Sequence, residues 1–140
     1  MSDVCFVADF FVDQVLGGGE LNNDVAIREL EKTHNVKKIN SHIVNVDFLK
    51  QNRNTTFIVS NFINLTQDCK DYLSSDCSYL IYEHDHKYLR ERNPVMYEEN
   101  NYKAPFDKII NFDFYKNAKT TLCQSRLHSE IMKRNLNIDN

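Results

Sequence analysis

Short apolar segments alternate with polar segments of helical character along the whole chain, and this alternation constrains the fold most. The segments with strand character are rich in Val, Ile, Phe and Tyr and lie at residues 4–11, 39–44, 56–60, 79–82 and 120–124. The segments with helical character lie at residues 20–34, 46–51, 66–73, 106–117 and 125–135. Regular alternation of strands and helices favours a parallel sheet that is covered by helices on both faces. The sequence therefore predicts an α/β fold, a Rossmann-like three-layer sandwich with a mainly parallel sheet of about five strands.

Length and charge limit the classes of protein to which the chain can belong. A length of 140 residues suits one domain with its own core, so we expect a single Rossmann-like domain over residues 1–140. The net charge of -3 gives no basic surface for nucleic acid. No apolar stretch approaches the ~20 residues that cross a bilayer, and the first residues do not resemble a signal peptide. We expect a cytoplasmic protein with no nucleic-acid partner and no membrane span.

The cysteines favour free thiols over disulfides or a metal site. Cys5, Cys69, Cys77 and Cys123 are irregularly spaced and lie mostly within apolar segments, which is typical of buried thiols. A zinc set could be imagined from two of these cysteines together with histidines at positions 84 and 86. The separations match no compact zinc module, so no metal site is expected.

All three glycines of the chain are consecutive, at Gly17, Gly18 and Gly19, between the first expected strand and the first expected helix. Residues without a Cβ let the backbone approach a ligand closely and adopt positive φ. The helix that follows offers unpaired N–H groups and a partial positive charge, so this loop is a candidate phosphate site. The pattern is neither the dinucleotide fingerprint nor a P-loop. The alternative interpretation is a flexible turn.

A second candidate site follows the expected strand at residues 79–82. Glu83, His84, Asp85 and His86 are four consecutive ionisable residues at the carboxyl end of that strand. In a parallel sheet this end faces the same crevice as the glycine loop, so His84 and the glycines are expected to share one edge. A histidine beside carboxylates can act as an acid, a base or a hydrogen-bond donor. The alternative is a solvated polar turn.

The segment at residues 84–103 is long, charged and rich in aromatic residues, and we expect an ordered excursion at the carboxyl edge. Arg90, with Lys87 and Arg92, could contact a phosphate or carboxylate there, or could carry solvated loop charges. His34, His42 and His128 lack such neighbours, and we expect them at the surface or an edge.

Ser125 follows the last expected strand and precedes a helix. It is predicted to be the N-cap of that helix, because its surroundings lack the glycines of a nucleophile elbow.

Three segments, in order, resemble the N-terminal domain of GT-B glycosyltransferases, especially the GT4-like group. Residues 6–11 followed by Gly17, Gly18, Gly19 and Glu20 resemble the first strand, the glycine-rich loop and the helix start of that family. Residues 79–85 resemble its strand that ends in a histidine near the cleft, and residues 118–135 resemble a strand with a serine-capped helix. Residues 21–24 differ from the small and apolar residues that the family has at the corresponding place.

The resemblance implies an acceptor-side domain that takes part in transfer of a sugar from a nucleotide sugar to a glycan or similar acceptor. It implies that Gly18 and Gly19 approach the donor diphosphate, with Gly17 and Glu20 beside them, and that His84 faces the reacting sugar. Glu83, Asp85, His86 and Arg90 are then candidates for substrate binding. The nucleotide sugar is a co-substrate, and no other cofactor is expected.

In that family a C-terminal domain binds the nucleotide sugar, and no such domain is expected within these 140 residues. Catalysis would then need a donor domain from a following segment or from a partner chain, and an uncovered apolar face could drive self-association. The isolated chain is accordingly expected to transfer no sugar. The runner-up function is a nonenzymatic α/β ligand-binding or interaction module. A nucleotide-dependent oxidoreductase is disfavoured by the glycine pattern.

Overall fold

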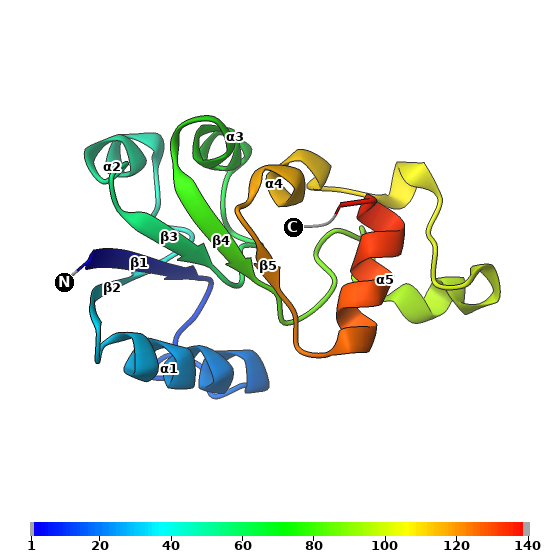
Figure 1. The fold of residues 1–140 in the computed structure, drawn as a ribbon, viewed down its shortest axis with the longest axis horizontal. Coiled ribbons are helices and arrows are strands. Elements are labelled where there is room, and N and C mark those ends of the chain that lie inside the picture. The colour runs from blue at the N-terminus through cyan, green and yellow to red at the C-terminus, as the bar shows by residue number, and fades with distance from the viewer. Residues whose placement is uncertain (1, 139–140) are drawn as a thin grey trace.

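The computed structural model describes residues 2–138, and within this range it contains one five-stranded sheet of order β2-β1-β3-β4-β5 (Figure 1). Every pair of neighbouring strands is parallel. The strands are β1 (Ser2–Ala8), β2 (His34–Asn40), β3 (Thr56–Val59), β4 (Ser78–Tyr82) and β5 (Thr121–Leu122). The predicted Rossmann-like α/β fold with a parallel sheet is thereby confirmed.

Helices cover both faces of this sheet. In Figure 1, α1 lies on one face, and α2, α3 and α4 lie on the other, with α5 beyond β5. The α-helices are α1 (Gly18–Leu30), α2 (Val46–Gln51), α3 (Gln67–Asp76), α4 (Phe112–Asn117) and α5 (Arg126–Leu136). Two short 3₁₀ helices, η1 (Pro94–Asn100) and η2 (Phe106–Lys108), lie between β4 and α4.

The interior strand β1 explains why the core has two halves. Its side chains alternate between the faces, as in any strand, and both sets are buried. Phe6 packs with Ile27 of α1 and Ile58 of β3 in a cluster on one face. Val7 belongs to a larger cluster on the other face, which includes Leu73 of α3. A strand buried on both faces has no polar side, and this is why its sequence is a continuous apolar run.

The expected boundaries are wrong at β2, which pairs with β1 from Ser2↔His34 to Ala8↔Asn40 and not through residues 39–44. The first helix ends at Leu30, so a turn of three residues leads directly into this strand. Lys37 and Lys38 are exposed on β2 because it is an edge strand with few buried side chains. An edge strand therefore does not show the apolar run by which the other strands can be identified.

The predicted helix at residues 106–117 is divided by an irregular segment. Ile109 forms an antiparallel bridge with Leu89, and Asn111 has a φ of 58°, in the left-handed region. The bridge ties the segment after β4 to the segment before α4. The expected excursion from residue 84 to residue 103 is therefore anchored to the domain, with Tyr88 and Leu89 fully buried.

Ser125 has the predicted capping role in α5. Its Oγ accepts a hydrogen bond from the backbone N–H of His128 at 3.1 Å. His128 itself contradicts the expectation of a surface residue, because only 8% of it is exposed. Its Nε2 donates to the backbone carbonyl of Asp85 at 2.9 Å, so this histidine joins α5 to the segment after β4.

Candidate functional site at the carboxyl edge of the sheet

The glycine loop and His84 meet at the carboxyl edge of the sheet. A Cβ added to Gly19 would lie 3.6 Å from the His84 ring and 3.4 Å from Nδ2 of Asn61, which follows β3. Three segments that follow β1, β3 and β4 are therefore adjacent, because parallel strands end on the same side. The glycine loop and His84 thus share one edge of the sheet, as a parallel sheet predicts for segments that follow two of its strands.

The three glycines do not need glycine for their own backbone conformation. None of them has a positive φ, so the left-handed conformation that glycine allows is not used here. Gly17 is the N-cap of α1 in an extended conformation, with no side chain to cap the first N–H groups. At Gly18, the first residue of the helix, an added Cβ would meet no protein atom within 4 Å. The surface above Gly18 is thus open, and nothing within the protein explains the missing side chain.

Glu20 partly covers the same helix N-terminus. Its Oε2 lies 2.7 Å from the position of a Cβ added to Gly17, so the carboxylate folds back over that residue. A carboxylate at a helix N-terminus is stabilised by the partial positive charge there. It also repels a second anion, so an anionic ligand has better access over Gly18 than over Gly17.

His84 is held by hydrogen bonds on both ring nitrogens. Its Nε2 lies 2.7 Å from Oδ1 of Asn23 in α1, and the Ser60 hydroxyl donates to the same oxygen at 2.8 Å. Nδ1 lies 2.8 Å from Nε2 of Gln124, an amide that can only donate. This pattern corresponds to a neutral imidazole with its proton on Nε2. The buried Nδ2 of Asn23 has no partner among the described residues.

The surroundings of His84 keep its ring neutral. Burial lowers its pKa to about 4, and the positive charge of Lys87 contributes to the same shift. At neutral pH the ring therefore carries no charge, and its one basic nitrogen faces Gln124. A ligand would have to displace the Gln124 amide before His84 could accept a proton, so the catalytic role of His84 stays a prediction.

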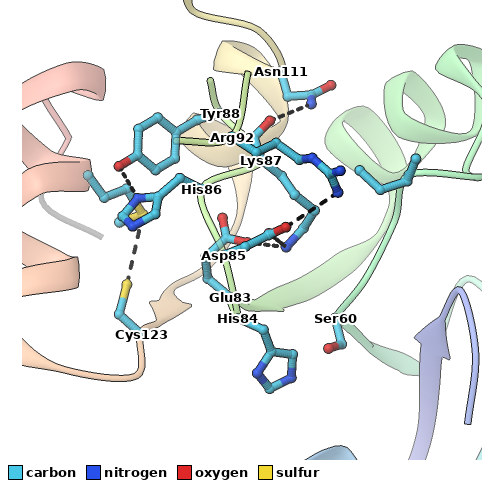
Figure 2. Close-up of polar contacts among 12 residues, drawn as sticks. Ser60, Glu83, His84, Asp85, His86, Lys87, Tyr88, Arg92, Asn111 and Cys123 are labelled. Carbon is cyan, nitrogen blue, oxygen red and sulfur yellow. Dashed lines mark hydrogen bonds and ion pairs between the residues drawn. The ribbon is translucent and has the colours of Figure 1, made fainter. Parts of the chain in front are cut away.

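Glu83 and Lys87 form a buried ion pair behind this surface (Figure 2). The two side chains are 0% and 1% exposed, and the Glu83 carboxylate also accepts a hydrogen bond from the Tyr115 hydroxyl. Burial raises the pKa of Glu83 to about 7, although Lys87 opposes the shift. Glu83 thus supports the site from beneath, and both of its carboxylate oxygens already have protein partners.

Asp85 and His86 turn in different directions from His84. Figure 2 shows Asp85 beside Lys87 and Arg92, and the structure gives ion pairs of 2.8 Å and 3.6 Å, respectively. The Nδ1 of His86 lies 2.5 Å from the Tyr88 hydroxyl. The centroids of the His86 and His128 rings are 4.2 Å apart. His86 therefore faces α5 and not the glycine loop.

A pocket of about 330 Å³ opens next to the buried ion pair, between the segments that follow β3 and β4. Its lining includes Arg90, which the sequence indicated as a candidate contact for a phosphate or carboxylate. It also includes residues that the sequence did not indicate. The lining residues are Phe62, Ile63, Lys70, Lys87, Arg90, Arg92, Ile110 and Asn111. Four of them are cationic, and none is a carboxylate.

Several contributors to this edge were missed because they are positioned by tertiary contacts alone. Asn23 and Gln124 lie far apart in sequence, yet both hydrogen-bond to His84. Lys70 comes from α3 and donates to Oδ1 of Asn111 at 2.9 Å. Ser60 and Gln124 did carry a signal in the sequence, because they end the expected strands at residues 56–60 and 120–124, and ligands bind at such strand ends.

Residues 2–138 contain no group of three or more His, Cys, Asp or Glu side chains that could hold a metal ion. None of the helices in this range has the length and apolar character that crossing a bilayer requires. Comparisons of the chain with protein-family profiles, with curated proteins and with solved structures found no match. The function must therefore be inferred from the fold and the geometry of the site.

Proposed function

We propose that the chain acts as the acceptor-side domain of a GT-B glycosyltransferase and takes part in transfer of a sugar from a nucleotide sugar to a glycan or similar acceptor. The observation that carries the proposal is the open backbone at Gly18, directly before Gly19, which borders the His84 ring. The all-parallel sheet supports it, because such sheets bind ligands at the carboxyl ends of their strands.

The chemistry of the edge suits a sugar diphosphate. The first N–H groups of α1 have no side-chain cap, and such groups donate readily to phosphate oxygens. A ligand phosphate over Gly18 would place its sugar near the His84 ring, which borders Gly19. The neutral His84 would then contribute hydrogen bonds, once the ligand has displaced the amide of Gln124.

On this proposal the site is completed by a donor-binding domain, either on the same polypeptide or on a partner chain. Stabilising the charge that develops on the leaving diphosphate requires several preorganised donors. One helix N-terminus supplies only part of them. The 140-residue chain alone is therefore expected to transfer no sugar but to retain weak binding at Gly18.

Amide and imidazole NMR signals of the 140-residue chain, followed during titration with UDP-glucose and GDP-mannose, test the proposal. We expect one of these nucleotide sugars to shift the signals of Gly18, Gly19 and His84. A different result, in which neither ligand shifts these signals while an unrelated small molecule does, would favour a nonenzymatic ligand-binding module.

The Gly18→Ala variant separates binding from folding. Because the new methyl group meets no protein atom, the fold should be retained, and unfolding should cost about 0.5–1 kcal/mol more than in the parent. The same methyl group would stand between a phosphate and the backbone, so the changes in NMR signal position that nucleotide sugars cause should become smaller. Val25→Ala is the matched control, since Val25 is exposed on the same helix and alanine also favours a helix there. It should leave the shifts unchanged.

A further inference from the structure

The pocket beside the buried ion pair has a one-sided charge. Lys70, Lys87, Arg90 and Arg92 line it, and no carboxylate does. Lys87 pairs with two acids, Glu83 and Asp85, and neither of them is part of the lining. The guanidinium of Arg90 forms no salt bridge with any residue from 2 to 138, so its charge is available to a ligand.

The walls of the pocket are held in place from several elements. Asp9, at the end of β1, accepts hydrogen bonds of 3.0 Å from the backbone N–H groups of Ile63 and Asn64. The ring of Phe62 is buried and lies 5.5 Å from Nζ of Lys70 and 5.0 Å from Nζ of Lys87. These contacts fix the ends of two lysines at one side of the pocket before any ligand arrives.

Further contacts hold other lining residues in place. The Asn111 side chain accepts from Lys70 at 2.9 Å and donates to the backbone carbonyl of Lys87 at 3.1 Å, which joins α3 to the segment after β4. Arg92 has a φ of 57°, a left-handed conformation that is uncommon for residues other than glycine. Burial lowers the pKa of Lys70, although Asp9 and Asp71 oppose the shift.

We propose that this pocket binds the phosphoryl group of a phosphorylated, sugar-sized ligand. Cations from two segments of the chain, α3 and the segment after β4, line it, and Arg90 and Arg92 can each donate two parallel hydrogen bonds to neighbouring phosphate oxygens. A phosphoryl group offers three such oxygens and up to two negative charges, whereas a carboxylate offers two oxygens and one charge. Ile63 and Ile110 supply apolar walls for the rest of the ligand.

The volume agrees with a ligand of this size. About 330 Å³ lies at the lower end of the range of about 300–1,000 Å³ that is usual for small-molecule sites. The identity of this ligand as the sugar acceptor rests on the proposed function, whereas the binding of the phosphoryl group does not. A phosphorylated acceptor in this pocket would lie on the same edge of the sheet as His84.

Isothermal titration of the 140-residue chain with glucose phosphate, inorganic phosphate, glucuronate and methyl glucoside tests the proposal. We expect glucose phosphate to bind most tightly and methyl glucoside not to bind. Glucuronate binding as tightly as glucose phosphate would overturn the choice of a phosphoryl group. Absence of binding by both phosphate compounds would overturn the site itself.

Variants of the two arginines locate the binding. Arg90→Gln and Arg92→Asn should each weaken glucose phosphate binding by about tenfold, since each removes a charged hydrogen-bond donor. Arg53→Gln removes an exposed charge outside the pocket and should change nothing. Lys87 is left intact because it pairs with the buried carboxylate of Glu83. Unchanged affinity in both arginine variants would refute the assignment.

The two proposals can fail independently. If glucose phosphate binds through Arg90 while nucleotide sugars leave the signals of Gly18 and His84 unchanged, the pocket assignment stands and the glycosyltransferase proposal is wrong. If nucleotide sugars shift the signals at Gly18 but the arginine variants bind glucose phosphate like the parent, the reverse holds.

Discussion

Replacing Lys87 by methionine removes the positive charge from the buried ion pair while keeping most of the side-chain volume. Both Lys87 and Glu83 are almost completely excluded from solvent. Removing one member of such a pair leaves the other charge buried without compensation, which typically costs about 3–5 kcal/mol. Because domains of this kind are stable by only about 5–15 kcal/mol, this loss should be evident in any unfolding experiment.

Urea unfolding followed by circular dichroism gives the size of this effect. We expect Lys87→Met to lower the free energy of unfolding by about 3–5 kcal/mol. The double variant Glu83→Gln/Lys87→Met leaves no unpaired charge at the fully buried position 83, so it should be more stable than Lys87→Met alone. Arg92→Met, which removes a half-exposed charge paired with Asp85 at 3.6 Å, is the matched control and should cost less than about 1 kcal/mol.

The pH dependence provides a second measure of the same effect. Burial already raises the pKa of Glu83 to about 7, and loss of Lys87 should raise it further. When the pKa of an acid is higher in the folded protein than in the unfolded chain, the folded protein loses stability as pH rises above the pKa of the unfolded chain. The free energy of unfolding of Lys87→Met should therefore be closest to that of the parent at low pH. A cost under about 1 kcal/mol for Lys87→Met, or a double variant no more stable than the single one, would show that the buried carboxylate does not depend on Lys87.

Burial lowers the pKa of His84 and of His86 to about 4, and that of His128 is lowered as well. As pH falls, the three imidazole rings are therefore protonated in the unfolded chain before they are protonated in the folded protein. The urea concentration at the midpoint of unfolding should fall as pH decreases from about 6.5 towards 4. A midpoint that does not change with pH would contradict the buried neutral rings. The raised pKa of Glu83 changes stability with pH in the opposite direction, but it involves one titrating group and the histidines are three. Ser125→Ala should lower the free energy of unfolding by about 1 kcal/mol, because it removes the N-cap of α5. Ser125→Asp, which keeps a cap acceptor, should restore most of this loss in thermal unfolding.

The sequence was sufficient to predict the sheet where strands are buried on both faces. β1 and β3 are continuous apolar runs, so their positions could be identified within a few residues. β2 could not, because this edge strand has only exposed or half-buried side chains and contains few apolar residues. The split between η2 and α4 was hidden for a related reason, since the bridge of Ile109 with Leu89 is a tertiary contact.

For the site, the sequence predicted which loops meet but not the roles of their side chains. Topology alone brings the residues after β1 and β4 to one edge. The burial of Glu83 was not predictable, because a glutamate at a strand end usually faces solvent. Its partner Tyr115 comes from α4, and Lys70 reaches the pocket from α3. Such convergence depends on how each helix is rotated against the sheet, which no local pattern specifies.

The exposed edge at β2 has a consequence for the behaviour of the protein at high concentration. Seven residues of this strand leave one row of backbone N–H and C=O groups open to pairing with another polypeptide. Lys37 and Lys38 lie on this strand, with their ammonium groups 5.2 Å from the Phe48 ring and 5.5 Å from the Phe11 ring, respectively. A second strand added at this edge would bring the same two charges of another copy close to them. The lysine pair thus discourages edge-to-edge aggregation along the longer of the two free sheet margins.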